Sequence, residues 1–144
     1  MATDPRTGMT ILDDAASWEL LSTADVVRIA VAVGDDLEVF PVNAVVDRRT
    51  LVFATGEGTK LAAAVVSGRV TVEADGFDRS FGEAWSVVVK GVPERLERFA
   101  DIQEAEELPL VPWSAHPKQW FVRVHPTEIT GRRFVTVRPP SSAH

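Results

Sequence analysis

The chain has no cysteine, which excludes disulfide bonds, zinc–thiolate centres, iron–sulfur clusters and catalytic thiolates together. Three histidines offer little material for an all-histidine metal site. Basic residues are scarce as well, because 15 Lys and Arg stand against 21 Asp and Glu, for a net charge of -6. Generic binding to nucleic acid needs a basic footprint, so this charge balance argues against a nucleic-acid partner.

Long apolar runs are also absent. No stretch approaches the roughly 18 residues that a membrane-spanning helix needs, and the polar residues 1–8 lack the apolar centre of a signal peptide. We therefore expect a cytoplasmic protein without a membrane partner. Hydrophobic residues make up 45% of the 144, which is enough for the core of one ordinary domain.

The beginning of the chain is predicted to form an arm and then a helix. Residues 1–10 have the composition of a flexible arm, and Thr10-Ile11-Leu12-Asp13 has the outline of a helix-capping box. Apolar residues then follow at helical spacing, which predicts a short helix over 11–22. The folded domain is expected to span 11–137, and 138–144 to be a disordered tail.

Most of the remaining chain has the alternation and the turn signals of strands. The pattern predicts about seven, mostly antiparallel, at 26–33, 37–46, 51–55, 70–74, 85–96, 120–125 and 128–137. Pro126 separates the last two of these, and Pro41 suggests an interruption in the second. Helices are expected at 59–66 and 98–107. Closed antiparallel sheets of this size are barrels or sandwiches.

A glycine-containing turn, Gly56-Glu57-Gly58, lies between a predicted strand and a helix that begins with Thr59-Lys60. Backbone N–H groups at such a turn attract anions, and a bound phosphate would balance the charge of a lysine in the first helical turn. The alternative is a solvated lysine after a flexible turn. The pattern GxxxxGK[ST] is not met, so it does not indicate a P-loop.

Two further strand segments have a structural and a functional interpretation. Pro41-Val42-Asn43 could leave backbone groups free to face a heterocycle, but a bend at a barrel corner explains the same pattern and is favoured by it. Trp85 and Ser86 begin an alternating run that ends at Gly91. The simplest interpretation of this run is a core strand, with Gly91 at a bulge or a close backbone approach.

A proline-rich loop over 108–118 presents Trp113 and Lys118, which could stack on a planar ligand and place a cation beside it. The alternative is a loop that is anchored on the barrel by Trp113. Nucleophilic catalysis finds no support, because none of the three histidines lies in a recognisable triad context. The acidic run over 104–107 is interpreted as a solvent-exposed helix face.

Taken in order over residues 12–136, these segments resemble the pyridoxamine 5′-phosphate oxidase-like family of flavin-binding split β-barrels, in particular its short actinobacterial-type members. The segments that carry the resemblance are Trp18-Glu19-Leu20-Leu21, Phe40-Pro41-Val42-Asn43, Phe53-Ala54-Thr55 through Lys60-Leu61, Trp85 through Gly91, Leu108-Pro109 through Trp113, Phe121 through Val124, and Glu128 through Phe134. The implied fold is mainly β: a six- to seven-stranded antiparallel split β-barrel with flanking short helices.

The resemblance also implies a homodimer with two FMN sites at the subunit interface and a small-molecule substrate. In that arrangement the isoalloxazine ring would face Pro41, Val42 and Asn43. The ribityl phosphate would be held by Thr55, Thr59 and Lys60, with Ala54 beside them. Trp85 and Ser86 would reach the flavin from the partner subunit, and Trp113 and Lys118 would border the ring.

The sequence departs from the true oxidases of this family in two places. Their second strand carries cations near the phosphate and the ring, whereas the aligned stretch here has Glu38 and Asn43. Arg132-Arg133 is only a loose echo of their substrate-binding signature. These departures argue against oxidation of pyridoxamine phosphate. The expectation is an FMN-dependent oxidoreductase; the alternatives are an F420-dependent reductase and a module that binds flavin or haem without turnover.

Overall fold

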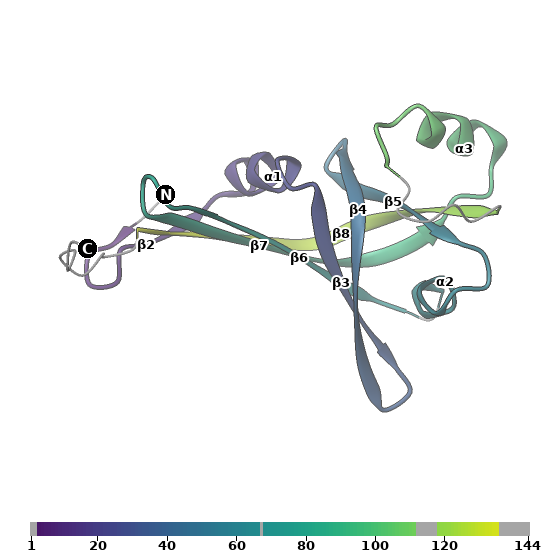
Figure 1. The fold of residues 1–144 in the computed structure, drawn as a ribbon, viewed down its shortest axis with the longest axis horizontal. Helices are drawn as coiled ribbons and strands as arrows, with labels where there is room; N and C mark the ends of the chain where they lie inside the picture. Colours follow the sequence, from purple (N-terminus) through teal and green to yellow (C-terminus); the bar gives the residue numbers. More distant parts are fainter. Residues whose placement is uncertain (1–2, 67, 112–117, 136–144) are drawn as a thin grey trace.

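The computed structural model describes residues 3–66, 68–111 and 118–135, which form one antiparallel sheet with three short helices (Figure 1). The elements are β1 (Thr3–Asp4), β2 (Met9–Leu12), α1 (Asp14–Ser22), β3 (Val26–Val33), β4 (Asp36–Asp47), β5 (Thr50–Gly56), α2 (Lys60–Val65), β6 (Val70–Asp78), β7 (Glu83–Arg95), α3 (Phe99–Glu106) and β8 (Gln119–Val135). The strand order is β1-β2-β8-β5-β4-β3-β6-β7, and β7 also pairs with β8. This last pairing closes a ring of six strands, which confirms the predicted split barrel.

The N-terminal residues differ from the expected arm. Met9–Leu12 pair with Gly131–Phe134 of β8, and β1 folds back on β2, so the first residues extend the sheet. The helix consequently begins later than predicted. Its N-cap is Asp13, whose side chain accepts a hydrogen bond from the Ala16 amide at 2.8 Å. The capping box expected at Thr10 is therefore wrong, because Thr10 belongs to β2.

The strand β4 changes partners along its length. Asp36–Asn43 pair with β3, whereas β5 pairs only with Ala44–Asp47. Among the described residues, the first part of β4 thus has a strand neighbour on one side only. Proline is tolerated in such an edge, so Pro41 lies in a continuous strand and the expected interruption is wrong. The hairpin of β3 and β4 projects away from the ring (Figure 1).

The last two predicted strands are a single strand, β8. Pro126 does not break it, because it lies opposite Gly91 at a register shift between β7 and β8. The bulge expected at Gly91 is confirmed. A side chain at Gly91 would collide with the carbonyl oxygen of His125, so the backbones approach closely there.

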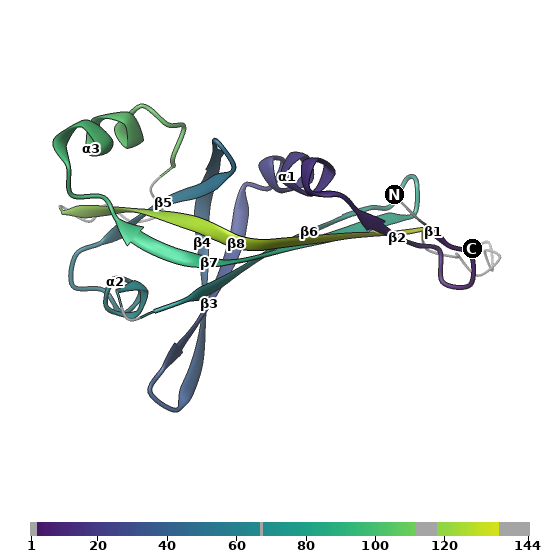
Figure 2. The same ribbon diagram turned by 180° about the vertical axis from the view of Figure 1, so that it is seen from behind.

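Two hydrophobic clusters lie on opposite faces of β5 and β8. The larger fills the ring and includes Phe53, Ile29, Val72, Val89 and Val122. The smaller lies under α3 and is built on Val52, Leu96 and Ala105. Beyond the ring, the paired strands β6, β7 and β8 continue as a long arm, and α1 covers one face of it (Figures 1 and 2).

Within the described residues, no helix has the length and apolar character needed to cross a membrane. Over the same residues, no cluster of three His, Asp or Glu side chains has the arrangement of a metal site. The helices are short elements that cover the sheet: α1 buries Ser17, Trp18 and Leu21, and α3 buries Ala105.

The contact between α1 and β8 depends on the absence of a side chain at Gly131. A Cβ atom there would collide with the hydroxyl of the buried Ser17. Gly131→Ala is expected to destabilise the protein by about 1–3 kcal/mol because the packed helix must shift. Ser17→Ala alone loses the bond to the Asp13 carbonyl, at a cost of about 1 kcal/mol.

In the double variant, Ser17→Ala removes the hydroxyl that Gly131→Ala would strike. The double variant is therefore expected to be destabilised by less than the sum of the single effects. Urea unfolding of the four proteins measures this coupling. Strictly additive effects would show that α1 does not rest on Gly131.

Candidate functional site

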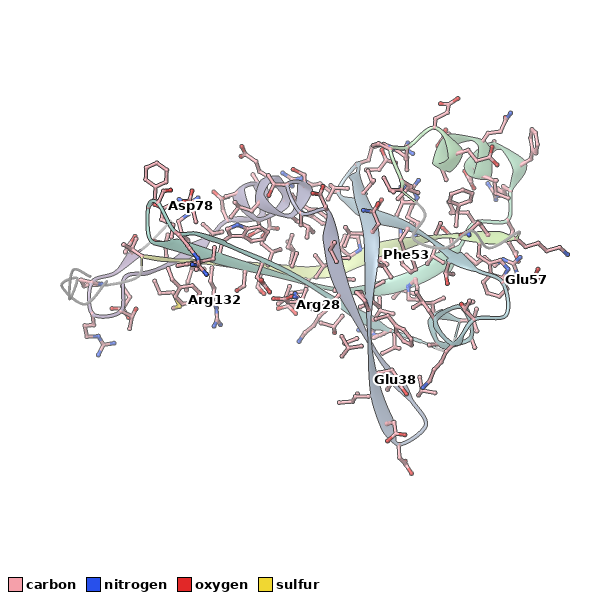
Figure 3. All side chains as sticks on the ribbon, in the orientation of Figure 1. Arg28, Glu38, Phe53, Glu57, Asp78 and Arg132 are labelled. Atoms are coloured by element: carbon pink, nitrogen blue, oxygen red, sulfur yellow. The ribbon has the colours of Figure 1, made fainter. Side chains whose placement is uncertain are left out.

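A cavity of about 520 Å³ opens where β4 and β5 diverge. Its walls are the free edge of β4, the end of β5 with the start of α2, and the segment after α3. The lining residues are Phe40, Pro41, Val42, Asn43, Ala54, Thr55, Gly56, Thr59, Lys60, Leu61, Ala105, Glu106, Leu108, Leu110, Val111, Gln119 and Phe121. In Figure 3, the labelled Glu38 and Glu57 lie near this end of the molecule, whereas Asp78 and Arg132 lie far along the arm.

Seven of the eleven sequence-predicted site residues line this cavity together: Pro41, Val42, Asn43, Ala54, Thr55, Thr59 and Lys60. They come from two segments that were singled out separately in the sequence. The chain brings them together because β4 and β5 are hairpin neighbours up to Ala44 and then separate.

The threonine corner of the cavity is held by its own hydrogen bonds. The Thr59 hydroxyl caps α2 by accepting from the Ala62 amide at 3.1 Å and donates to the Gly56 carbonyl at 2.8 Å. The Thr55 hydroxyl lies 3.0 Å from the same oxygen. Because Thr59 has already donated its only hydroxyl proton, Thr55 is the donor in this pair. Both hydroxyl protons are thus used within the protein.

Among the described residues that line the cavity, Lys60 is the only basic one. Its Nζ lies 2.7 Å from Oε1 of Glu38, which belongs to the part of β4 that pairs with β3 alone. The lysine side chain is 64% exposed, so the ion pair contributes only about 0.2–1 kcal/mol to stability. Glu38 therefore provides the balancing negative charge that the sequence led us to expect from a bound phosphate.

Asn43 joins two walls of the cavity. Its Nδ2 donates to the Asp25 carbonyl at 2.7 Å, and its Oδ1 accepts from the Val111 amide at 3.1 Å. The side chain amide thus ties the segment after α3 to the edge of β4. Both ends of the amide are engaged within the chain, although the expectation was that this residue faces a ligand.

Of the other four predicted residues, the three that the structure describes, Lys118, Trp85 and Ser86, do not line the cavity. Trp113 lies outside the described residues. Lys118 lies close to the α2 end, because its carbonyl accepts from the Glu57 amide at 2.9 Å and its Nζ is 3.9 Å from the Glu57 carboxylate.

Trp85 and Ser86 are on β7, in the arm. Trp85 packs against the core of its own chain and covers Gly76, while Ser86 pairs with Asp75 and Arg132. Successive residues of a strand point to opposite faces, so Ser86 lies on the face of the arm away from α1.

Sequence analysis singled out the loop over 108–118 but named only Trp113 and Lys118 in it as site residues. In the structure, Leu108, Leu110 and Val111 of this loop line the cavity with Ala105 and Glu106 of α3. No local pattern indicates which residues of the loop face the cavity. Gln119 and Phe121 were missed for the same reason.

One carboxylate outside the cavity has a shifted pKa. Burial and the nearby Asp75 raise the pKa of Glu73 above its usual value, and the guanidinium of Arg28, 3.0 Å away, opposes this shift only in part. This cluster lies on β3 and β6, on the same face of the sheet as Ser86. It belongs to the outer surface of the barrel.

The geometry of the cavity suits a flat, mostly apolar molecule with polar edges. Each wall carries apolar side chains, the unpaired edge of β4 offers backbone N–H and C=O groups, and Lys60 places one positive charge at one end. Pockets of this size and character hold small organic ligands and cofactors.

Comparison with known proteins defines the class of protein. A model of the pyridoxamine 5′-phosphate oxidase family matches residues 13–133, and the chain therefore belongs to this family. An uncharacterised protein of Mycobacterium tuberculosis, Rv3129, is 47% identical over 89 residues, which are 62% of this chain and 79% of that protein.

Two solved structures are similar over most of the chain. The FAD-binding protein from Mycobacterium smegmatis is 43% identical, with a TM-score of 0.77 over 87% of this chain and 99% of that one. A candidate pyridoxamine 5′-phosphate oxidase from Corynebacterium glutamicum is 32% identical, with a TM-score of 0.80 over 95% of this chain and 100% of that one.

The role of Asn43 can be tested with two substitutions. Asn43→Ala removes both hydrogen bonds and is expected to destabilise the protein by about 1–3 kcal/mol. Asn43→Asp retains an acceptor for the Val111 amide and loses only the donor to Asp25. Hydrogen exchange of the Val111 amide should therefore accelerate in Asn43→Ala and stay close to wild type in Asn43→Asp. Equal exchange in all three proteins would show that Asn43 does not hold this wall.

Proposed function

We propose that this protein binds FMN in the cavity between β4 and β5 and uses it in an oxidation–reduction reaction with a small-molecule substrate. The observation that carries the proposal is the convergence of an apolar cavity of about 520 Å³, an unpaired strand edge and one lysine at its end. The family membership supports a flavin, and the relative from Mycobacterium smegmatis is named for binding FAD.

In this proposal, the ring and the phosphate of the flavin contact different parts of the cavity. The ring lies against Pro41 and Val42, where the edge of β4 is free to hydrogen-bond with its polar rim. The phosphate lies toward Lys60, with Thr55 and Thr59 shaping the corner. The flavin supplies the redox chemistry, and the residues of this chain orient the ring and exclude water around it.

We further propose that the protein is a homodimer. The face of the arm opposite α1 carries apolar side chains that the described chain leaves uncovered: Ile11 is 60% exposed and Phe77 57% exposed. Register places Met9 and Phe134 on the same face as Phe77. Exposed apolar surface of this kind is typical of an interface, and a second copy would bury it together with Ser86.

Titration with FMN, followed by quenching of flavin fluorescence, tests the binding site. Wild-type protein is expected to bind FMN at micromolar concentration. Ala54→Trp fills the cavity and should weaken binding by roughly tenfold or more, because the packed walls leave no room for both rings. Ala15→Trp, at an exposed position of α1, is the control and should bind like wild type. No binding of FMN by the wild type would remove the proposal.

Light scattering tests the dimer. The wild-type mass is expected to be twice that of the 15.7 kDa chain. Phe77→Asp places a charge on the uncovered face of the arm and should shift the protein toward a monomer. Phe99→Asp changes another exposed phenylalanine, on α3, and should leave the mass unchanged. A wild-type monomer at micromolar concentration would contradict the proposed interface.

Turnover separates an enzyme from a binding module. Anaerobic addition of NADPH, or of reduced F420, should bleach the visible absorbance of the bound flavin, and admission of an acceptor should restore it. A flavin that binds but resists both donors would indicate a carrier or sensor. Comparative titration with FMN and F420 distinguishes the two cofactors.

A further inference from the structure

We propose that Glu38 sets the selectivity of the cavity among flavins by competing with a phosphate group for Lys60. This inference rests on the proposed function, because it concerns the same cavity. The contact that carries it is the 2.7 Å ion pair between Glu38 Oε1 and Lys60 Nζ. The Glu38 side chain is only 28% exposed and extends from the part of β4 that pairs with β3 alone, so its carboxylate lies largely against the protein beside the lysine.

The described residues of the cavity carry no excess positive charge for a phosphate. Among the described residues that line it, Lys60 and Glu106 are the only two charged ones, and Glu38 adds a second carboxylate next to the lysine. The hydroxyl protons of Thr55 and Thr59 are used inside the protein. A phosphate that approaches Lys60 must therefore displace Glu38 or lie beside a like charge.

The penalty grows with the charge of the approaching group. A terminal phosphomonoester, as in FMN, carries between one and two negative charges near neutral pH, whereas each phosphate of a diester carries one and the hydroxyl of riboflavin carries none. Glu38 thus reduces the advantage that FMN would gain over the uncharged riboflavin from the lysine. The selectivity follows from one carboxylate and does not require a change in the shape of the cavity.

Glu38→Gln tests this directly, because it removes the charge and keeps the size of the side chain. The affinity for FMN is expected to rise by about three- to tenfold, and that for riboflavin to stay within about twofold. The gain should shrink as salt is raised, because the pair is partly exposed. Asp36→Asn, two residues away on the same strand, removes the same charge from the protein as a whole and serves as the matched control.

Lys60→Gln completes the test. In this background Glu38→Gln should change the affinity for FMN much less than it does in wild type, because no ammonium is left to compete for. A larger ratio of FMN to riboflavin affinity in Glu38→Gln, but not in Asp36→Asn, supports the proposal. An unchanged ratio while both flavins bind overturns it and leaves the flavin site in place. Failure of every variant to bind either flavin overturns the proposed function itself.

Discussion

The separation of β5 from β4 at Ala44 is the constraint on which the candidate site depends. Up to that point the two strands are hydrogen-bonded neighbours; beyond it, β4 stays with β3 while Ala54 to Gly56 follow β8. On the outer face of the sheet, Val52 of β5 and Phe121 of β8 pack in the smaller hydrophobic cluster under α3, which helps to hold β5 to β8. A barrel that remained closed here would bury the edge of β4 and would have no cavity at this position.

Where β4 and β5 separate, backbone groups of β4 lose a strand partner. Two residues of this edge, Pro41 and Asn43, are suited to that loss. Pro41 has no N–H to satisfy, so it is suited to an edge strand. Asn43 is the last residue before the strands join, and its side chain bonds to Asp25 on one side and Val111 on the other. The segment after α3 thus takes the place of the missing strand along part of the edge. The same residues that open the barrel also hold the third wall against it.

The elements with strong local signals were the predictable ones. The alternating strands from Val26 to Gly56, the Thr59 cap of α2 and the bulge at Gly91 all follow from patterns within a few residues. The predictions were wrong where pairing with a strand far away in the sequence determines the secondary structure. Met9–Leu12 became a strand because β8 offers an open edge, and Pro126 stayed within β8 because it lies opposite Gly91, where the register between β7 and β8 shifts. No window of local sequence contains either partner.

In the candidate site, too, local patterns predicted some residues, whereas contacts between distant segments were not predicted. The local pattern singled out Thr59 and Lys60, and the family resemblance added Thr55 and the Pro41 segment. Neither revealed how the hydrogen-bond donors of these side chains are used. Glu38 stands 22 residues before Lys60 in the sequence and was noted only as a departure from related enzymes. In the fold it lies against the lysine ammonium, so a difference in one strand becomes a difference in charge at the cavity. A residue outside the cavity lining thus sets the charge that the proposed flavin phosphate would meet at Lys60.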